Sequence, residues 1–260
     1  MPSIYLSASN QFGNVGADGV SEGERMHRLA DDIAGLLRKQ GIVVFRNEKH
    51  LTPWGITCDS NTKKPDLHVA LHSNSSDNAH RGQASGTETW TYRLAGTDSA
   101  RFGALLQKKI VGALGLPDRG LKDATVPGCR WDEVYRTKAT AVLTEIFFHD
   151  NPRDIARFKE RYQDVVVALA EAIGDWFGIE IKKGEPSMGK GEPRTGEGPF
   201  KDLDPNRYST RSILKLCKAG ILHGCDDGTF RPEEPLTREQ FAVAIDCMME
   251  YLEKVLGVTL

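Results

Sequence analysis

The chain has 260 residues, enough for one large domain or for a medium domain followed by a small one. Hydrophobic residues make up 39%, which supports a packed core, and 34 basic against 36 acidic side chains leave a formal net charge of -2. This balance gives no electrostatic reason to expect nucleic acid or an anionic membrane as a partner, and no apolar run reaches the roughly 20 residues that span a bilayer.

The first part of the chain alternates strand-like and helix-like segments. Strands are expected at residues 4–6, 42–45, 68–71, 87–92 and 141–148, and helices at residues 26–37, 99–114 and 151–176. The strands are apolar or β-branched runs, and Asn151-Pro152 supply an N-cap and a first-turn proline for the last helix. This alternation predicts an α/β fold with a mostly parallel sheet flanked by helices. Ligands bind at the carboxyl ends of strands in such sheets, so the residues that follow each strand are candidates for a site.

A change in composition after Trp176 divides the chain. Residues 180–199 read EIKKGEPSMGKGEPRTGEGP, with abundant glycine, proline and alternating charge and almost no apolar side chain. Such a segment buries too little surface to offset its ordering entropy, which predicts a linker. The expected organisation is a larger domain at 1–180, a flexible linker at 181–199 and a small module at 200–260.

Two polar residues stand where a parallel sheet would place a site. His72 directly follows the strand at 68–71, where a hydrogen-bonded structural role is the alternative to a ligand role. Glu22 lies at the entrance of the first helix. Ser21 and Glu24 fit a capping box, which gives Glu24 a structural duty and leaves Glu22 free to act as a ligand.

Glu145 is the third candidate, because it interrupts the apolar strand at 141–148. A carboxylate inside a buried strand is costly unless it is paired, bound to a metal or used in chemistry. The structural alternative is a salt bridge to an arginine such as Arg136. Together, Glu22, His72 and Glu145 suggest a catalytic zinc site with histidine and carboxylate ligands and a glutamate base.

Residues 68–74 read HVALHSN, and residues 141–151 read AVLTEIFFHDN. These two segments are similar to the strands I-H-x-N and A-V-L-x-E-x-x-F-x-x-N of one family. In them the first 180 residues resemble the zinc-dependent N-acetylmuramoyl-L-alanine amidases of the amidase-3 type, which occur in autolysins and phage endolysins. Glu22 precedes Ala30 by the spacing of the glutamate that opens the family's first helix. The resemblance implies zinc ligands at Glu22 and His72, a catalytic base at Glu145 and substrate contact at Asn74.

The end of the first strand departs from the family. Where relatives carry D-P-G-H-G-G, whose histidine is a zinc ligand, residues 6–14 read LSASNQFGN, similar to the S-x-S-x-Q-x-x-N of a clostridial and phage-like subgroup. Asn10 aligns with the missing histidine, and Gln11 is adjacent and is the expected metal contact. The third zinc ligand stays open between Asn10, Gln11 and a distant histidine such as His68 or His149.

The tail contains the segments FKDLD at 200–204, ILKLCKAGILHG at 213–224, DDGTFRP at 226–232 and LTREQF at 236–241. Together these segments resemble one S-layer homology motif. The resemblance implies a small all-α module that binds secondary cell-wall polysaccharide, with Arg238 at the recognition segment; a solvated helix-start charge is the alternative. A lone copy buries little apolar surface, which favours packing on the larger domain or a homo-oligomer.

Cysteine usage and the N-terminal sequence bear on the compartment. The five cysteines are scattered without a C-x-x-C pair, which argues against a zinc knuckle or a disulfide framework, and reduced thiols are favoured over a bond between Cys217 and Cys225. The first residues lack the basic and apolar stretches of a secretory signal. The prediction is a protein made in the cytoplasm that acts on the bacterial cell wall after release.

The predicted function is hydrolysis of peptidoglycan at the amide between N-acetylmuramic acid and L-alanine. In that reaction Glu145 takes a proton from the attacking water and delivers it to the leaving amine. One alternative is a non-catalytic wall-binding protein that lost zinc together with its histidine. The other is a zinc peptidase that cuts within the stem peptide.

Overall fold

The computed structural model describes residues 1–77, 79–129, 131–182, 200–203, 209–225 and 227–256. The chain divides into two compact units, Met1–Pro186 and Ser187–Leu260. Most of the predicted linker at 181–199 lies outside the described residues. The two units are described separately.

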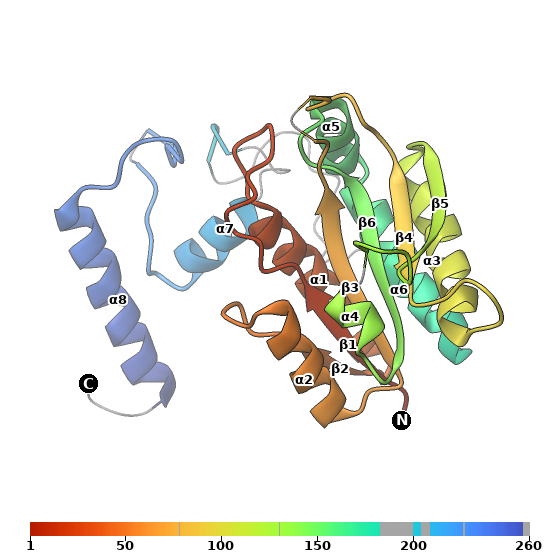
Figure 1. Ribbon diagram of the computed structural model, residues 1–260. Coiled ribbons are helices and arrows are strands. Elements are labelled where there is room, and N and C mark those ends of the chain that lie inside the picture. Colours follow the sequence, from red (N-terminus) through yellow and green to blue (C-terminus); the bar gives the residue numbers. More distant parts are fainter. Residues whose placement is uncertain (78, 130, 183–199, 204–208, 226, 257–260) are drawn as a thin grey trace. The chain divides into compact units, whose positions relative to one another are not determined.

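The first unit is built on a sheet of six strands in the order β2-β1-β3-β6-β4-β5 (Figure 1). The strands are β1 (Ser3–Ala8), β2 (Val43–Arg46), β3 (Leu67–Asn74), β4 (Thr87–Thr91), β5 (Asp118–Asp123) and β6 (Thr140–Phe148). Only the β4–β6 pair is antiparallel among these strands. The predicted α/β fold with a mostly parallel sheet is therefore confirmed.

One face of the sheet carries the main core. Leu67, Val69 and Leu71 of β3 are fully buried in it, as the alternation of side chains along a strand requires. This face is covered by apolar residues of the helices α1 (Glu22–Lys39), α3 (Asp98–Leu114), α5 (Pro152–Glu160) and α6 (Tyr162–Phe177). Their packing fixes the strands whose ends carry the candidate site.

The opposite face of the sheet, called the polar face below, carries the candidate polar residues beside a small apolar cluster. The alternate residues of β3, His68 and His72, share this face with Ala70, which packs on Val134. Only the helices α2 (Pro53–Lys63) and α4 (Asp132–Tyr135) cover it among the described elements, and Figure 1 shows α4 lying over β3 and β6. The candidate residues thus lie on the thinly covered side of the sheet.

The last helix of the first unit differs from the prediction. The single helix expected at 151–176 is interrupted at Arg161, which ends α5 (Pro152–Glu160) and precedes α6. Arg161 has φ −104° and ψ 18°, and its side chain donates to the carbonyl of Ala113. Asn151 caps α5 through its side chain, as predicted.

Sequence patterns did not predict α2, α4 or β5. The α2 sequence PWGITCDSNTK has no continuous apolar stripe, and α4 is a single turn of four residues. The β5 sequence DRGLKD is charged, because this strand lies at the edge of the sheet and has no fully buried face.

The second unit contains α7 (Thr210–Lys218) and α8 (Arg238–Leu256), in agreement with an all-α module. Thr237 and Gln240 form a reciprocal cap at the start of α8, with Thr237 Oγ1 accepting from Gln240 N at 3.1 Å. Cys217 and Cys225 are free thiols. Over the residues that the structure describes, no helix is long and apolar enough to cross a membrane.

Candidate active site

Strand register brings two of the predicted residues together. His72 of β3 lies opposite Glu145 of β6, and Glu145 in turn lies opposite Glu88 of β4. Residues in register on neighbouring strands point to the same face of the sheet. A histidine therefore stands beside two carboxyl groups near the carboxyl ends of β3 and β6.

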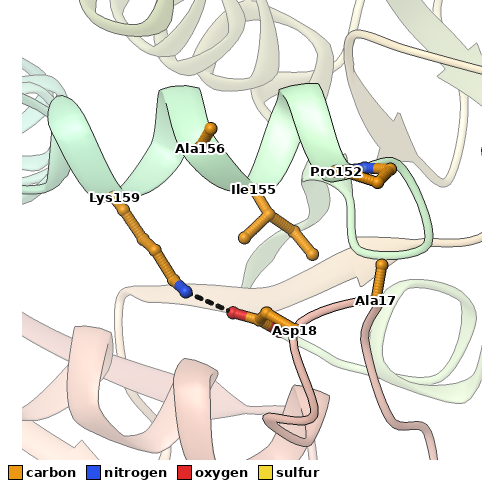
Figure 2. A pocket seen from close by; sticks show the side chains of 6 residues that line it. All are labelled: Ala17, Asp18, Pro152, Ile155, Ala156 and Lys159. Atoms are coloured by element: carbon orange, nitrogen blue, oxygen red, sulfur yellow. Dashed lines mark ion pairs between the residues drawn. The ribbon is translucent and has the colours of Figure 1, made fainter.

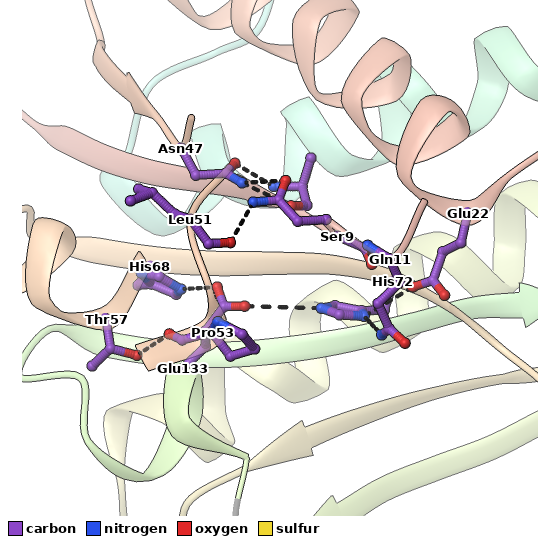
Figure 3. Close-up of polar contacts among 12 residues, drawn as sticks. Ser9, Gln11, Glu22, Asn47, Leu51, Pro53, Thr57, His68, His72 and Glu133 are labelled. Carbon is purple, nitrogen blue, oxygen red and sulfur yellow. Dashed lines mark hydrogen bonds and ion pairs between the residues drawn. The ribbon is translucent and has the colours of Figure 1, made fainter. Parts of the chain in front are cut away.

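Glu22 reaches this group from the start of α1. The predicted capping box of Ser21 and Glu24 is present, and Glu22 is almost fully buried. Its Oε1 lies 3.0 Å from Nδ1 of His72 (Figure 3). Its Oε2 accepts a hydrogen bond from Nδ2 of Asn14 at 3.1 Å. Burial alone would raise the pKa of Glu22, but the contacts with His72, Ser9 and Asn14 together outweigh it and keep the pKa below its usual value.

Gln11 approaches the same imidazole nitrogen, and Figure 3 shows it beside Glu22 and His72. Its Nε2 lies 3.4 Å from Nδ1 of His72, while its Oε1 accepts from Nδ2 of Asn14 at 2.5 Å. An amide nitrogen does not bind zinc, whereas an amide oxygen does so weakly. A half-turn of the Gln11 amide exchanges the two atoms without moving the backbone.

Asn10, which aligns with the missing histidine, has other contacts. Its amide nitrogen donates to the carbonyls of Glu48 and Leu51, and its Oδ1 lies 2.7 Å from Nε2 of His27. Asn10 therefore holds the loop that follows β2. The structure brings Gln11, and not Asn10, to His72.

Glu145 is the least stabilised carboxyl group of the site. Its side chain is partly exposed, and its Oε2 has no hydrogen-bond partner. Burial raises the pKa of Glu145 to about 8, with smaller contributions from Glu22 and Glu88 that His72 opposes. Arg136, the partner expected for a structural glutamate, instead pairs with Asp132 at 3.2 Å.

Glu133 of α4 is a buried site residue that the sequence analysis missed. Its Oε2 lies 3.0 Å from Nε2 of His68, and its Oε1 lies 3.9 Å from Nε2 of His72. Nδ1 of His68 in turn lies 2.9 Å from Oγ of Ser60. These contacts use both nitrogens of His68, so His68 is not available as the third metal ligand.

Glu88 is a second site residue that the sequence patterns did not identify, and it holds the side chains beside the site. Its Oε1 accepts from Nδ2 of Asn74 at 3.1 Å and from Nε1 of Trp90 at 3.2 Å, and its Oε2 accepts from Nε of Arg119 at 2.7 Å. The predicted substrate residue Asn74 is thus beside the site, held by Glu88. A carboxylate inside a strand was the signal that identified Glu145, and the same signal was present at Glu88.

Two further histidines, His149 and His27, have structural contacts. Nδ1 of His149 lies 3.1 Å from Oγ of Ser73 and 3.0 Å from its carbonyl oxygen. His27 contacts Asn10, and burial together with the charge of Arg46 lowers the pKa of His27 to about 4. Neither histidine contacts Glu22 or His72 through a hydrogen bond described in the structure.

A surface hollow of about 230 Å³ lies away from these residues, between α5 and the loop before α1 (Figure 2). Its one ion pair joins Lys159 and Asp18 at 2.7 Å, and Asp18 also pairs with Arg25. Burial would raise the pKa of Asp18, but these cations hold it at about 2. The hollow anchors the loop that leads to Glu22 and presents no candidate catalytic group.

Arg238, the predicted wall-binding residue, belongs to the second unit. It is the first residue of α8, and its side chain is exposed. It lies directly after the cap formed by Thr237.

The side chains around His72 include atoms that can bind a divalent metal ion. Glu22 and His72 supply one carboxylate and one imidazole, and Gln11 supplies an amide. Within the described ranges of the chain, no group of three or more His, Cys, Asp or Glu side chains is placed to hold a metal ion. Nε2 of His72 and Oε2 of Glu145 are buried without hydrogen bonds. The residues fit a metal with two strong donors and one weak donor.

Two family models match the chain. Residues 8–175 match the family model of N-acetylmuramoyl-L-alanine amidase, and residues 199–242 match that of the S-layer homology domain. A search of curated proteins finds no match.

Solved amidase structures share the fold of the first unit. The catalytic domain of CwlV from Bacillus (Paenibacillus) polymyxa is 24% identical with a TM-score of 0.59, over 69% of this chain and 100% of that one. An amidase from Clostridium difficile 630 is 23% identical with a TM-score of 0.58, over 70% and 98%. The catalytic domain of the CD27L endolysin, which targets Clostridia difficile, is 25% identical with a TM-score of 0.55, over 67% and 98%.

The structure brings Glu22, His72 and Glu145 together on a fold that solved amidase structures share. The chain belongs to the N-acetylmuramoyl-L-alanine amidase family. It is a peptidoglycan hydrolase with a cell-wall-anchoring module of the S-layer homology type.

Proposed function

We propose that the amidase reaction of this chain depends on zinc, held by Glu22, His72 and the amide oxygen of Gln11. The observation that carries this proposal is the convergence on Nδ1 of His72, with Glu22 Oε1 at 3.0 Å and the Gln11 amide at 3.4 Å. Two oxygen or nitrogen donors on one tetrahedral zinc ion are about 3.3 Å apart. When bound, zinc supplies Lewis acidity toward the scissile carbonyl and toward water.

Glu145 is the proposed general base and acid. Its free Oε2 is available to accept a proton from the attacking water and to pass it to the amine of the departing L-alanine. A carboxyl group with a raised pKa keeps a proton more readily than an ordinary glutamate, which suits the second step. The positive charge of a nearby metal favours the ionised form that the first step needs.

Matched variants of Gln11 and Asn10 test the ligand set. Gln11→Ala removes the third donor, so we expect zinc affinity to fall by about tenfold or more. Asn10→Ala removes contacts with the loop after β2 and should leave zinc affinity unchanged in the folded protein. Competition with a chromophoric chelator measures both affinities. A larger loss in Asn10→Ala than in Gln11→Ala would contradict the assignment.

For the second unit we propose binding of secondary cell-wall polysaccharide through a surface that includes Arg238. The exposed side chain of Arg238 at the start of α8 supports this role. Pull-down with purified walls should retain the wild-type protein and lose Arg238→Ala. Self-association is the second candidate, because α8 exposes large apolar side chains. They include Phe241, Val243, Met249, Tyr251 and Val255. Light scattering of the full chain distinguishes a monomer from an oligomer.

A further inference from the structure

Glu133 lies between two histidines of β3. His68 and His72 are four residues apart on the same strand and therefore point to the same face of the sheet. Glu133 extends from α4 above that face, with one carboxylate oxygen 3.0 Å from Nε2 of His68 and the other 3.9 Å from Nε2 of His72 (Figure 3). Each histidine thus meets a different oxygen of one carboxylate.

The His68 side of this arrangement is rigid. Ser60 and His68 have no exposed surface, and Ser60 Oγ lies 2.9 Å from Nδ1 of His68. The imidazole also stacks on the ring of Tyr5, with ring centroids 5.2 Å apart. His68 therefore holds Oε2 of Glu133 in place and leaves Oε1 directed at His72.

The His72 side is incomplete. Nε2 of His72 is buried and has no hydrogen-bond partner, while Nδ1 faces Glu22 at 3.0 Å. A separation of 3.9 Å from Glu133 is about 1 Å longer than an ordinary N–H···O bond. A small movement of either side chain would complete that bond. A carboxylate that accepts Nε2–H would leave Nδ1 of His72 as the unprotonated, metal-facing nitrogen.

Resting on the proposed metal-dependent function, we propose that Glu133, held by His68, is a positioning residue that orients the imidazole of His72 toward Glu22. The order Ser60, His68, Glu133 resembles a nucleophile triad, but the hydroxyl of Ser60 is fully buried and no substrate reaches it. Glu133 acts through His72 and does not contact the reacting atoms.

The isosteric change Glu133→Gln tests this role. A carboxylate has two acceptor oxygens and can serve both histidines, whereas an amide has one acceptor and turns its NH₂ group toward the other histidine. Asp132→Asn is the matched control, because Asp132 precedes Glu133 on α4, undergoes the same change and pairs with Arg136. Two quantities are measured for each variant: zinc affinity, and the NMR signal of the His72 Nε2 proton in metal-free and zinc-loaded protein.

We expect Glu133→Gln to weaken zinc binding by about tenfold or more. The Nε2 proton of His72 should exchange faster with water in this variant, with or without zinc. Asp132→Asn should match the wild type in both measurements. An unchanged proton signal in Glu133→Gln, or a zinc affinity within about twofold of the wild type, would overturn the proposal.

The NMR signal of the His72 Nε2 proton in metal-free protein tests the positioning role of Glu133 independently of zinc binding. If the wild type binds no zinc, the proposed metal dependence fails, while a proton signal that depends on Glu133 still supports the positioning role. If Glu133→Gln does not fold, His68→Phe serves as the second variant, because phenylalanine retains the stack on Tyr5 and removes the donor to Glu133. It should change the same signal and weaken zinc binding by a smaller factor. An unchanged signal in folded His68→Phe would overturn the proposal.

Discussion

The two faces of the β3 strand differ in chemistry and in their effect on folding. Leu67, Val69 and Leu71 lie in the main apolar core, whereas His68 and His72 lie among buried carboxyl groups under α4. Burying a leucine contributes about 2 kcal/mol to folding, whereas a buried ionisable group costs stability unless it is paired. The apolar face therefore stabilises the fold, and that stability offsets the cost of burying the ionisable groups of the candidate site.

Among substitutions on the polar face, we expect the one at Glu145 to lower turnover most. Glu145→Gln retains the shape of the side chain but cannot exchange the catalytic proton, so we expect turnover to fall by about 10²- to 10⁴-fold. Release of soluble products from purified peptidoglycan measures turnover, and circular dichroism checks the fold. Near-wild-type turnover in a folded variant would make Glu145 a structural residue.

The apolar face should show the opposite response. Leu106→Ala removes a fully buried side chain of α3 and should lower the free energy of unfolding by about 2–5 kcal/mol. Because Leu106 packs on the side of the sheet away from His72, turnover per folded molecule should remain close to that of the wild type. Urea denaturation and turnover at low temperature measure the two quantities. A selective loss of turnover would show that the two faces are not independent.

Because the pKa of Glu145 is raised, we expect the folding stability of the metal-free protein to depend on pH. Its pKa is about 8 in the fold and about 4.3 in the unfolded chain, so the folded state keeps the proton to higher pH. This contribution to stability is present below about pH 4.3 and is lost as pH rises toward 8.

Glu145→Gln removes that dependence. The metal-free variant should therefore be more stable than the metal-free wild type by on the order of 2–4 kcal/mol at pH 8, and the difference should shrink toward pH 4.5. Urea titrations across this range, with chelator present, provide the measurement. A difference that does not vary with pH would contradict the raised pKa.

The smallest effect on the chemistry is expected from removing the second unit. Both faces of the sheet belong to Met1–Pro186, so deletion of Ser187–Leu260 should leave hydrolysis of small soluble muropeptides unchanged. Lysis of intact walls should fall by about tenfold or more, because tethering raises the local concentration of substrate. Equal loss on both substrates would place the second unit within the catalytic fold.

Sequence patterns were sufficient where structure follows from local chemistry. The apolar runs at β3 and β6, the capping box at Ser21 and the N-cap at Asn151 each predicted an element that the structure contains. The charged edge strand β5 and the single turn α4 carry no comparable pattern. The interruption at Arg161 was missed because the residues on both sides of it favour a helix.

Some residues of the candidate site could be identified from sequence patterns, whereas others could be identified only from the structure. His72 and Glu145 were identifiable because each is a polar residue at or near the end of an apolar strand. Glu133 was not, because its role depends on a contact with His68 across 65 residues of sequence. The structure was also needed to choose between Asn10 and Gln11 as the candidate metal ligand, because only the structure shows that Asn10 is hydrogen-bonded to the loop after β2.

We propose that the polar face of the sheet carries out metal-assisted cleavage of the amide between muramic acid and L-alanine. Mass spectrometry can identify the products released from purified walls by the wild-type protein, with chelator present and after zinc is restored. We expect intact stem peptides with a free L-alanine amine, their loss in chelator and their return with zinc. Cleavage within the stem peptide, or full release by metal-free protein in excess chelator, would contradict it.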